Sequence, residues 1–214
     1  MELDNNAEFV KLYKKLERVK DTDPETFNYY ENKYEIITSF RNMRNVLCHV
    51  DNPGQVSDTF LNELRTFVNK LTTTVTDIYV PISKIQSAKL NDELCEIVAL
   101  MSENNYSFVP ILDEEKRLLG VISENDILNL SLKNSGILND DEIIVSDYLN
   151  SFGLDTDSNY FFEFVNRQEM ATSIKTIFSS FRNNKICGMV FVTEHGKQSE
   201  KILGFVSPWD VINL

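Results

Sequence analysis

The first third of the chain carries apolar residues at the spacing of amphipathic helices. A second helix is predicted to begin at Pro24 and to carry its apolar stripe toward His49, where the turn cluster "DNPG" follows. Ser57 can cap a third helix. We therefore predict a three-helix N-terminal domain over residues 1–75. In its first helix the apolar positions, three or four residues apart, are Phe9, Leu12, Tyr13, Leu16 and Val19.

From residue 76 the pattern changes to strands that alternate with helices. An amphipathic helix is followed by the strand "YSFVPIL", a polar turn, the strand "LLGVIS" and the start of a helix. The same order returns from residue 161, with "FFEFV", a helix, "ICGMVFV", a turn, "KILGFVS" and "PWDVINL". This repetition predicts an α/β (α+β) fold with two βαββα repeats, residues 76–132 and 161–214, joined by a connector over 133–160.

Both repeats end in one short motif. "GVISEND" at residues 120–126 aligns with "GFVSPWD" at residues 204–210. A Ser hydroxyl beside the free N–H groups at the start of a helix can bind an anion, and an Asp three residues later can accept hydrogen bonds from both hydroxyls of a ribose. The alternative is a capping box. The two interpretations are compatible, because the cap creates the donors that a phosphate would use.

The order of elements, the closing motif and the "VPIL" strand resemble a tandem pair of cystathionine β-synthase (CBS) domains over residues 77–214. The resemblance implies that the two repeats pack sheet to sheet and bind adenosine-containing nucleotides in the clefts between them. It assigns Ser123 and Asp126 to one cleft, and Ser207 and Asp210 to the other. Further expected ligand contacts are Ile85 and Phe164, which would flank the base, and Val109, Pro110 and Met189, which would line it.

Charge narrows the expected ligand. The chain has a net charge of -12, most of it in the repeats. Dense Lys and Arg are needed for binding to duplex DNA, so we expect no DNA partner. The basic residues nearest the predicted clefts are few (Lys84, Lys89, Arg167 and Lys185). We therefore expect an AMP-like regulatory ligand with few phosphates (AMP, a cyclic nucleotide or adenosine) and no cofactor. Trp209 would crowd the cleft of Ser207 and Asp210, stack on a base, or serve as a core or dimer-interface aromatic.

The stretch "FRNMRNVLCHVDN" raises a second hypothesis. Arg44 and His49 resemble the R-x(4–6)-H signature of HEPN domains, many of which are metal-independent ribonucleases. The resemblance implies that His49 acts as general base while Arg44 steadies the scissile phosphate. Residues five apart lie about 140° apart around a straight helix, so the helix would have to end or bend near Cys48. Alternatively, Arg41 and Arg44 pair with acids, and His49 lies near a helix C-terminus, where a cation is favoured.

Other classes of function are disfavoured. Three scattered cysteines and two histidines do not suit a Cys/His zinc site, and a Gly-rich phosphate loop, HExxH and GxSxG are all missing from the sequence. Neither a signal peptide nor a membrane-length apolar run is visible, so we expect a cytoplasmic protein with no membrane partner. We favour a regulatory nucleotide-binding homodimer that signals through its helical domain to a protein partner. A ribonuclease gated by the repeats and a ligand-free scaffold remain alternatives.

Overall fold

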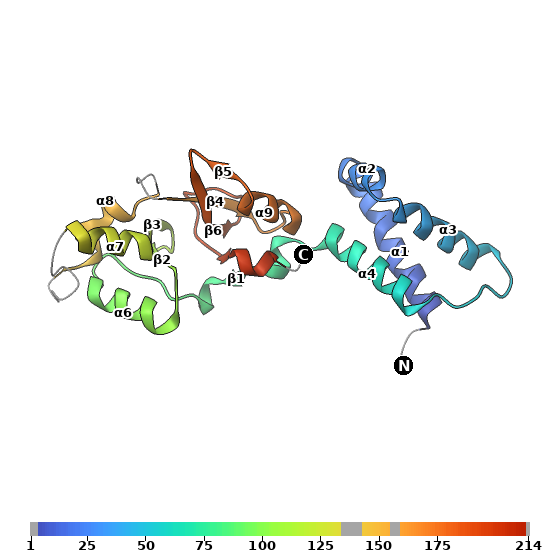
Figure 1. Cartoon of the computed structure of the whole chain (residues 1–214), viewed down its shortest axis with the longest axis horizontal. Helices are drawn as coiled ribbons and strands as arrows, with labels where there is room; N and C mark the ends of the chain where they lie inside the picture. Colours follow the sequence, from blue (N-terminus) through green and yellow to red (C-terminus); the bar gives the residue numbers. More distant parts are fainter. Residues whose placement is uncertain (1–3, 134–142, 155–158, 213–214) are drawn as a thin grey trace. The chain divides into compact units, whose positions relative to one another are not determined.

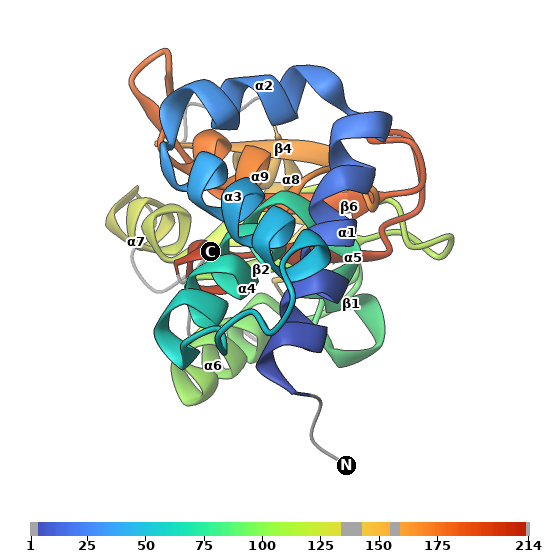
Figure 2. The same ribbon diagram turned by 90° about the vertical axis from the view of Figure 1, so that its right-hand side faces the viewer.

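The computed structural model describes residues 4–133, 143–154 and 159–212. The chain divides into two compact units, Met1–Thr73 and Thr74–Leu214, and each is described by itself. The first unit is helical (Figure 1). Its central helix is α1, because α1 packs against each of the other three helices (Figure 2). The helices are α1 (Asn5–Thr22), α2 (Pro24–Lys33), α3 (Ile36–His49) and α4 (Asp58–Thr72).

This unit has four helices where the sequence pattern predicted three. The segment expected to run as one helix from Pro24 toward His49 is interrupted at Tyr34, whose backbone is extended (φ -127°, ψ 107°). The Tyr34 ring packs against Tyr30 and Phe67, with ring centroids 5.9 Å and 6.0 Å away. Neither Pro nor Gly marks the break. Packing against α4 therefore overrides a continuous apolar stripe that by itself favours one long helix.

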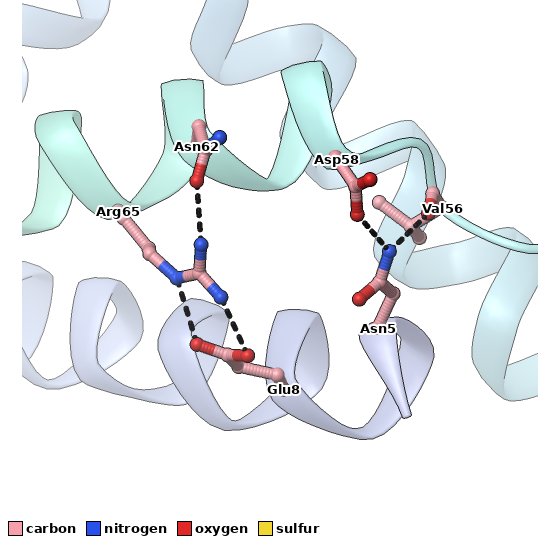
Figure 3. A network of polar contacts seen from close by, with 6 residues as sticks. All are labelled: Asn5, Glu8, Val56, Asp58, Asn62 and Arg65. Carbon is pink, nitrogen blue, oxygen red and sulfur yellow. Dashed lines mark hydrogen bonds and ion pairs between the residues drawn. The ribbon is translucent and has the colours of Figure 1, made fainter. Parts of the chain in front are cut away.

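Polar side chains fasten α1 to α4 beside the aromatic core. Figure 3 shows Arg65 donating from Nε and Nη2 to the two carboxylate oxygens of Glu8, at 2.8 Å and 2.7 Å. Nearer the start of both helices, the Asn5 amide donates to the Val56 carbonyl at 3.0 Å and to Asp58 at 2.8 Å. A two-pronged Arg–carboxylate contact is directional as well as favourable, so it fixes the register of α1 along α4.

In the first repeat, a two-stranded antiparallel sheet lies with two helices. The strands are β2 (Phe108–Leu112) and β3 (Leu118–Ser123), and the helices are α6 (Leu94–Asn104) and α7 (Glu124–Lys133). The expected first strand is reduced to a single parallel bridge from Ala88 to β2. Before it lie α5 (Val75–Ile78), β1 (Val80–Pro81) and the 3₁₀ turn η1 (Ile82–Lys84).

The second repeat is built around a larger sheet. Its strand β4 (Tyr160–Asn166) runs parallel to β6 (Lys185–Thr193), and β7 (Gly204–Val206) is antiparallel to β6. The segment between the repeats contributes η3 (Val145–Tyr148) and α8 (Leu149–Phe152), and the remaining elements are α9 (Ala171–Phe178), β5 (Phe181–Arg182) and η4 (Pro208–Val211).

Two features of the second repeat differ from the predicted pattern. The helix expected to continue to "FRNN" ends at Phe178, and Phe181–Arg182 instead forms β5, which pairs with β6 across Asn183 and Asn184. Both asparagines have positive φ (53° and 64°), as a tight hairpin turn requires. The closing helix is the short 3₁₀ turn Pro208–Val211.

The segment that precedes each repeat packs against the other repeat. Val75 donates its backbone N–H to the carbonyl of Glu169 at 2.8 Å, and β1 then pairs with β7. In the matching position, Val145 donates to the carbonyl of Asp92 at 3.0 Å. Each repeat therefore receives the segment that precedes the other repeat. The βαββα repeats and the helical first unit confirm the predicted fold class.

One apolar cluster joins the two sheets. The hairpin of the first repeat also hydrogen-bonds to the second repeat, since Ile202 donates its N–H to the Lys116 carbonyl at 2.9 Å. The sheets thus face one another across a shared core. Its buried members are Leu112, Leu118 and Val121 from the first repeat, and Met189, Phe191 and Ile202 from the second.

A membrane-crossing helix, one both long and apolar enough, is not found among the residues that the structure describes.

The exchange of β1 onto β7 depends on a glycine. A Cβ on Gly204 would lie 2.1 Å from the Val80 carbonyl oxygen, which is backbone and cannot rotate away. We expect Gly204→Ala to lower the free energy of unfolding of the second unit by about 2–3 kcal/mol, measured by chemical denaturation. The control is Gly54→Ala, because a Cβ there meets nothing within 4 Å and should change stability by less than about 0.5 kcal/mol. Unchanged stability in Gly204→Ala would contradict the β1–β7 pairing.

The Glu8–Arg65 contact predicts a pH effect on the helical unit. Hydrogen bonding from Arg65 lowers the pKa of Glu8 below its ordinary value of 4.5. A lowered folded-state pKa gives stability that is present above the unfolded value and is lost as pH falls through the folded value. Acidification below pH 4.5 should therefore destabilise the wild-type unit more than Glu8→Gln, as seen in thermal unfolding followed by circular dichroism. Glu63→Gln, at an exposed position of α4, is the control and should keep the wild-type dependence; equal slopes in all three proteins would count against the contact.

Candidate functional site

A cleft of about 190 Å³ opens in the second unit. Three parts of the unit line it: β1 with the residues that follow it, β2 with the residues just before it, and β7. Most of the wall is apolar or aromatic, with one cation. The lining residues are Val80, Lys84, Ile85, Gln86, Tyr106, Phe108, Pro110 and Phe205.

The pleat of β2 decides which of its side chains reach the cleft. Successive residues of a strand point to opposite faces, so Phe108 and Pro110 share the face that lines the cleft. Val109, also predicted as a ligand contact, points the other way and is buried in the core of the first repeat with α6. The structure thus places Pro110 and Ile85 at the cleft and removes Val109 from it.

Ser207 and Asp210 do not line this cleft, but they follow one of its lining residues, Phe205, along the chain. Ser207 follows Phe205 by two residues and has an extended backbone (φ -99°, ψ 165°), so its side chain returns to the cleft-facing side about 7 Å further on. Asp210 accepts hydrogen bonds at Oδ2 from the Ser207 backbone N–H and hydroxyl, both at 2.7 Å. Its second oxygen, Oδ1, is the one that a ligand hydroxyl would use.

Ser123 and Asp126 repeat this arrangement at the end of β3. Asp126 Oδ2 accepts from the Ser123 hydroxyl at 2.5 Å and from its N–H at 3.2 Å, and the Asp126 N–H donates back to the hydroxyl at 3.1 Å. This is the capping arrangement that the sequence left as an alternative. Burial raises the pKa of Asp126, and the Ser123 hydrogen bonds oppose that rise.

In the other half of the unit, the position equivalent to the open cleft is filled by side chains. Val121 is the counterpart of Phe205, and it lies in the buried cluster between the sheets. Ala88 pairs in parallel with β2, and Val165 pairs in the equivalent way with β6. Ile85 and Phe162 each stand three residues earlier, so they are counterparts. The Phe162 ring lies 6.0 Å from Phe108 and 6.1 Å from Phe191. Aromatic packing therefore fills the position around Phe162, whereas the equivalent position around Ile85 is open.

The β5 hairpin packs on the other face of β4, because Phe161 and Glu163 alternate with Phe162. Arg182 lies over the Phe161 ring, with its guanidinium carbon 4.7 Å from the centroid, and forms an ion pair with Glu163. Behind it, Phe164 stacks on Phe191 at 5.7 Å. Phe164 and Met189, both predicted to contact a ligand, are thus part of the apolar cluster that joins the sheets.

Only one of the four basic residues expected near the ligand lines the open cleft. Lys84 does so, whereas Arg167 pairs with Glu194 at 3.1 Å. The Trp209 side chain is 78% exposed and lies outside the lining. The cleft can therefore offer an aromatic surface and one ammonium group.

The structure does not bring Arg44 and His49 together. Helix α3 continues through His49, so the bend that convergence requires does not occur before that residue. The Arg44 guanidinium faces α1, with Nη2 3.5 Å from a Glu17 oxygen. His49 is exposed at the end of α3. Arg41 pairs with Glu31, so both arginines take acidic partners.

Sequence reasoning missed several residues of the cleft. Phe205 stands inside the second motif, and Phe108 alternates with Pro110, so both could have been found from strand periodicity. Tyr106 continues that alternation. Val80 carries no comparable signal, because its place in the wall depends on β1 pairing with a strand more than a hundred residues later.

Comparison with known proteins gives one family match and several structural similarities. Residues 75–133 match the family model of the CBS domain. No curated protein matches the chain. Among solved structures, a conserved protein domain of unknown function from Neisseria meningitidis MC58 is similar, with 19% identity and a TM-score of 0.50, over 73% of this chain and 88% of that one. This likeness shows the fold.

Two weaker structural similarities are to proteins with nucleotides in their titles. CBSX2 in complex with AMP has 17% identity and a TM-score of 0.46, over 65% of this chain and 92% of that one. CbpB in complex with c-di-AMP has 16% identity and a TM-score of 0.49, over 69% and 87%. These ligands belong to those proteins.

Proposed function

We propose that this protein is a regulatory sensor that binds an AMP-like adenine nucleotide in the open cleft. The observation that carries the proposal is the aromatic cleft, whose lining residue Phe205 stands two residues before Ser207 in the predicted Ser207–Asp210 motif. Two of the residues that the CBS resemblance assigns to the base, Ile85 and Pro110, lie in its wall.

The lining favours a particular ligand chemistry. Tyr106, Phe108 and Phe205 offer aromatic surface to a flat base. The volume of about 190 Å³ is smaller than that of a typical small-molecule site, so the base enters and the sugar lies over the rim. There Asp210 Oδ1 accepts hydrogen bonds from the ribose hydroxyls. Lys84 is the one cation in the lining, which suits one phosphate better than three.

The route from ligand to signal passes through β1. Val80 lines the cleft and pairs with Phe205, and its strand follows α5 at the start of the second unit. Along the chain, α5 comes directly after α4 of the helical unit. A ligand that favours one position of β1 therefore acts on the segment to which the helical unit is attached. The coupling is limited by the ligand's difference in affinity for the two positions.

Calorimetric titration with AMP tests the ligand and its site. We expect one AMP per chain, in the cleft lined by Phe108 and Phe205, because aromatic packing fills the equivalent position around Phe162. Asp210→Asn should weaken binding about tenfold, the loss of one hydrogen bond to a charged group. Asp126→Asn is the matched control at the filled position and should change the affinity less than about twofold.

The result can go against the proposal in two ways. Absence of binding to AMP, ADP, ATP and S-adenosylmethionine would support the ligand-free scaffold. Equal weakening by Asp126→Asn and Asp210→Asn would place the ligand elsewhere.

We also propose that a second copy of the chain covers exposed apolar residues of the repeats. On α7, Leu128 and Leu132 are 55% and 76% exposed, and they share a face because they are four residues apart. On and just after η4, Trp209 and Ile212 are 78% and 59% exposed. Large apolar side chains left in water in this way are typical of interaction surfaces.

Sedimentation equilibrium tests this association. The wild-type chain should have the mass of a dimer, and Leu132→Glu combined with Trp209→Ser should shift it toward the monomer, because a charge at an apolar interface is costly. Tyr29→Ser, at an exposed aromatic of the helical unit, should leave the mass unchanged. A monomeric wild-type protein would refute the proposal.

A further inference from the structure

A second cleft, of about 250 Å³, lies within the helical unit between α1, α2 and α3. We call it the basic cleft, because three of its lining side chains are cations and one is an acid. This concentration is unusual for the unit, whose segment 1–75 has more acids than bases. The lining residues are Tyr13, Leu16, Glu17, Lys20, Phe27, Arg41, Arg44 and Asn45.

Helix geometry brings the charges together. On α1, Tyr13, Glu17 and Lys20 are spaced four and three residues apart and therefore lie on one face. On α3, Arg41 and Arg44 are three apart and share a face in the same way. The cations thus reach the cleft from two different helices.

The three cations differ in the ion pairs and hydrogen bonds that they already form within the protein. Arg41 is held by its ion pair with Glu31, and it also hydrogen-bonds to the Tyr13 hydroxyl. Arg44 has a loose contact of 3.5 Å to Glu17 and donates to Asn45 at 3.2 Å. Within the described part of the chain, Lys20 has no ion pair, and its ammonium lies 5.6 Å from the centre of the Phe27 ring.

We propose that the basic cleft binds a phosphate monoester. Lys20 and Arg44 approach from different helices and hold the phosphate oxygens, with Arg41 behind them. A phosphate monoester offers three terminal oxygens and about two negative charges, which matches donors that converge from several directions and a lining with a net charge of +2. A carboxylate has two oxygens in one plane and one charge, so it engages fewer of these donors.

The remaining wall limits what the phosphate is attached to. The Phe27 ring and Leu16 offer apolar surface beside the cations. The volume admits a phosphate with one small group, such as a single ring. His49 is not in the lining, so the cleft supplies binding and does not supply the general base of the ribonuclease hypothesis.

An NMR titration of the full ¹⁵N-labelled chain with phenyl phosphate tests the proposal, and benzoate serves as the carboxylate comparison. We expect saturable shifts confined to α1, α2 and α3, with at least about tenfold weaker binding of benzoate. Arg44→Gln and Lys20→Gln should each weaken phenyl phosphate binding about tenfold. Arg18→Gln removes an exposed cation of α1 that does not line the cleft and should leave the affinity unchanged.

Several results would overturn the proposal. These are shifts that do not saturate, benzoate binding as tight as that of phenyl phosphate, or an effect of Arg18→Gln equal to that of Arg44→Gln. Arg41 is left intact in every variant because its contacts with Glu31 and Tyr13 support the fold. Asp210→Asn should not alter phenyl phosphate binding, so failure here is distinguishable from failure of the nucleotide proposal.

Discussion

The pairing of β1 with β7 is the contact on which the second unit depends. It places a segment that precedes the first repeat against the last strand of the second, and Gly204 allows the Val80 carbonyl to approach. Gly120 has the same role opposite the carbonyl of Phe152. Because each repeat receives the leading segment of the other, neither has its full set of contacts alone. The same pairing places Val80 and Phe205 in the wall of the open cleft. The contact that stabilises the second unit therefore also forms the cleft.

The two halves share a backbone plan but differ in side-chain volume. Where the first repeat has Ile85, the second has Phe162, whose ring packs against its neighbours in the shared cluster. A protein interior is close-packed, so one large ring in place of a smaller side chain can convert a potential site into core. Two repeats with the same backbone plan thus differ in whether this position is open or filled.

The sequence was most informative where local chemistry repeats. The two Ser-x-x-Asp units and the order of strands and helices depend on neighbours within a few residues, and they predicted the repeats. The CBS resemblance named Ile85 and Pro110, both of which line the open cleft. The break at Tyr34 was missed because its cause lies in α4. Val109 was assigned to the wrong side of its strand. Which cleft stays open could not be predicted, because it depends on the exchange and on contacts between the sheets.

Charge distribution gives the two units different capacities for binding. The open cleft of the repeats offers aromatic surface with a single ammonium, from Lys84, so the proposed nucleotide would be selected mainly through its base. The basic cleft of the helical unit has the opposite balance, with three cations around a small apolar wall, so its selectivity must come from the anion. The two clefts therefore differ in which part of a ligand they would select. Under the two proposals, one chain would bind two ligands through different residues, and β1 connects the nucleotide cleft along the chain to α5.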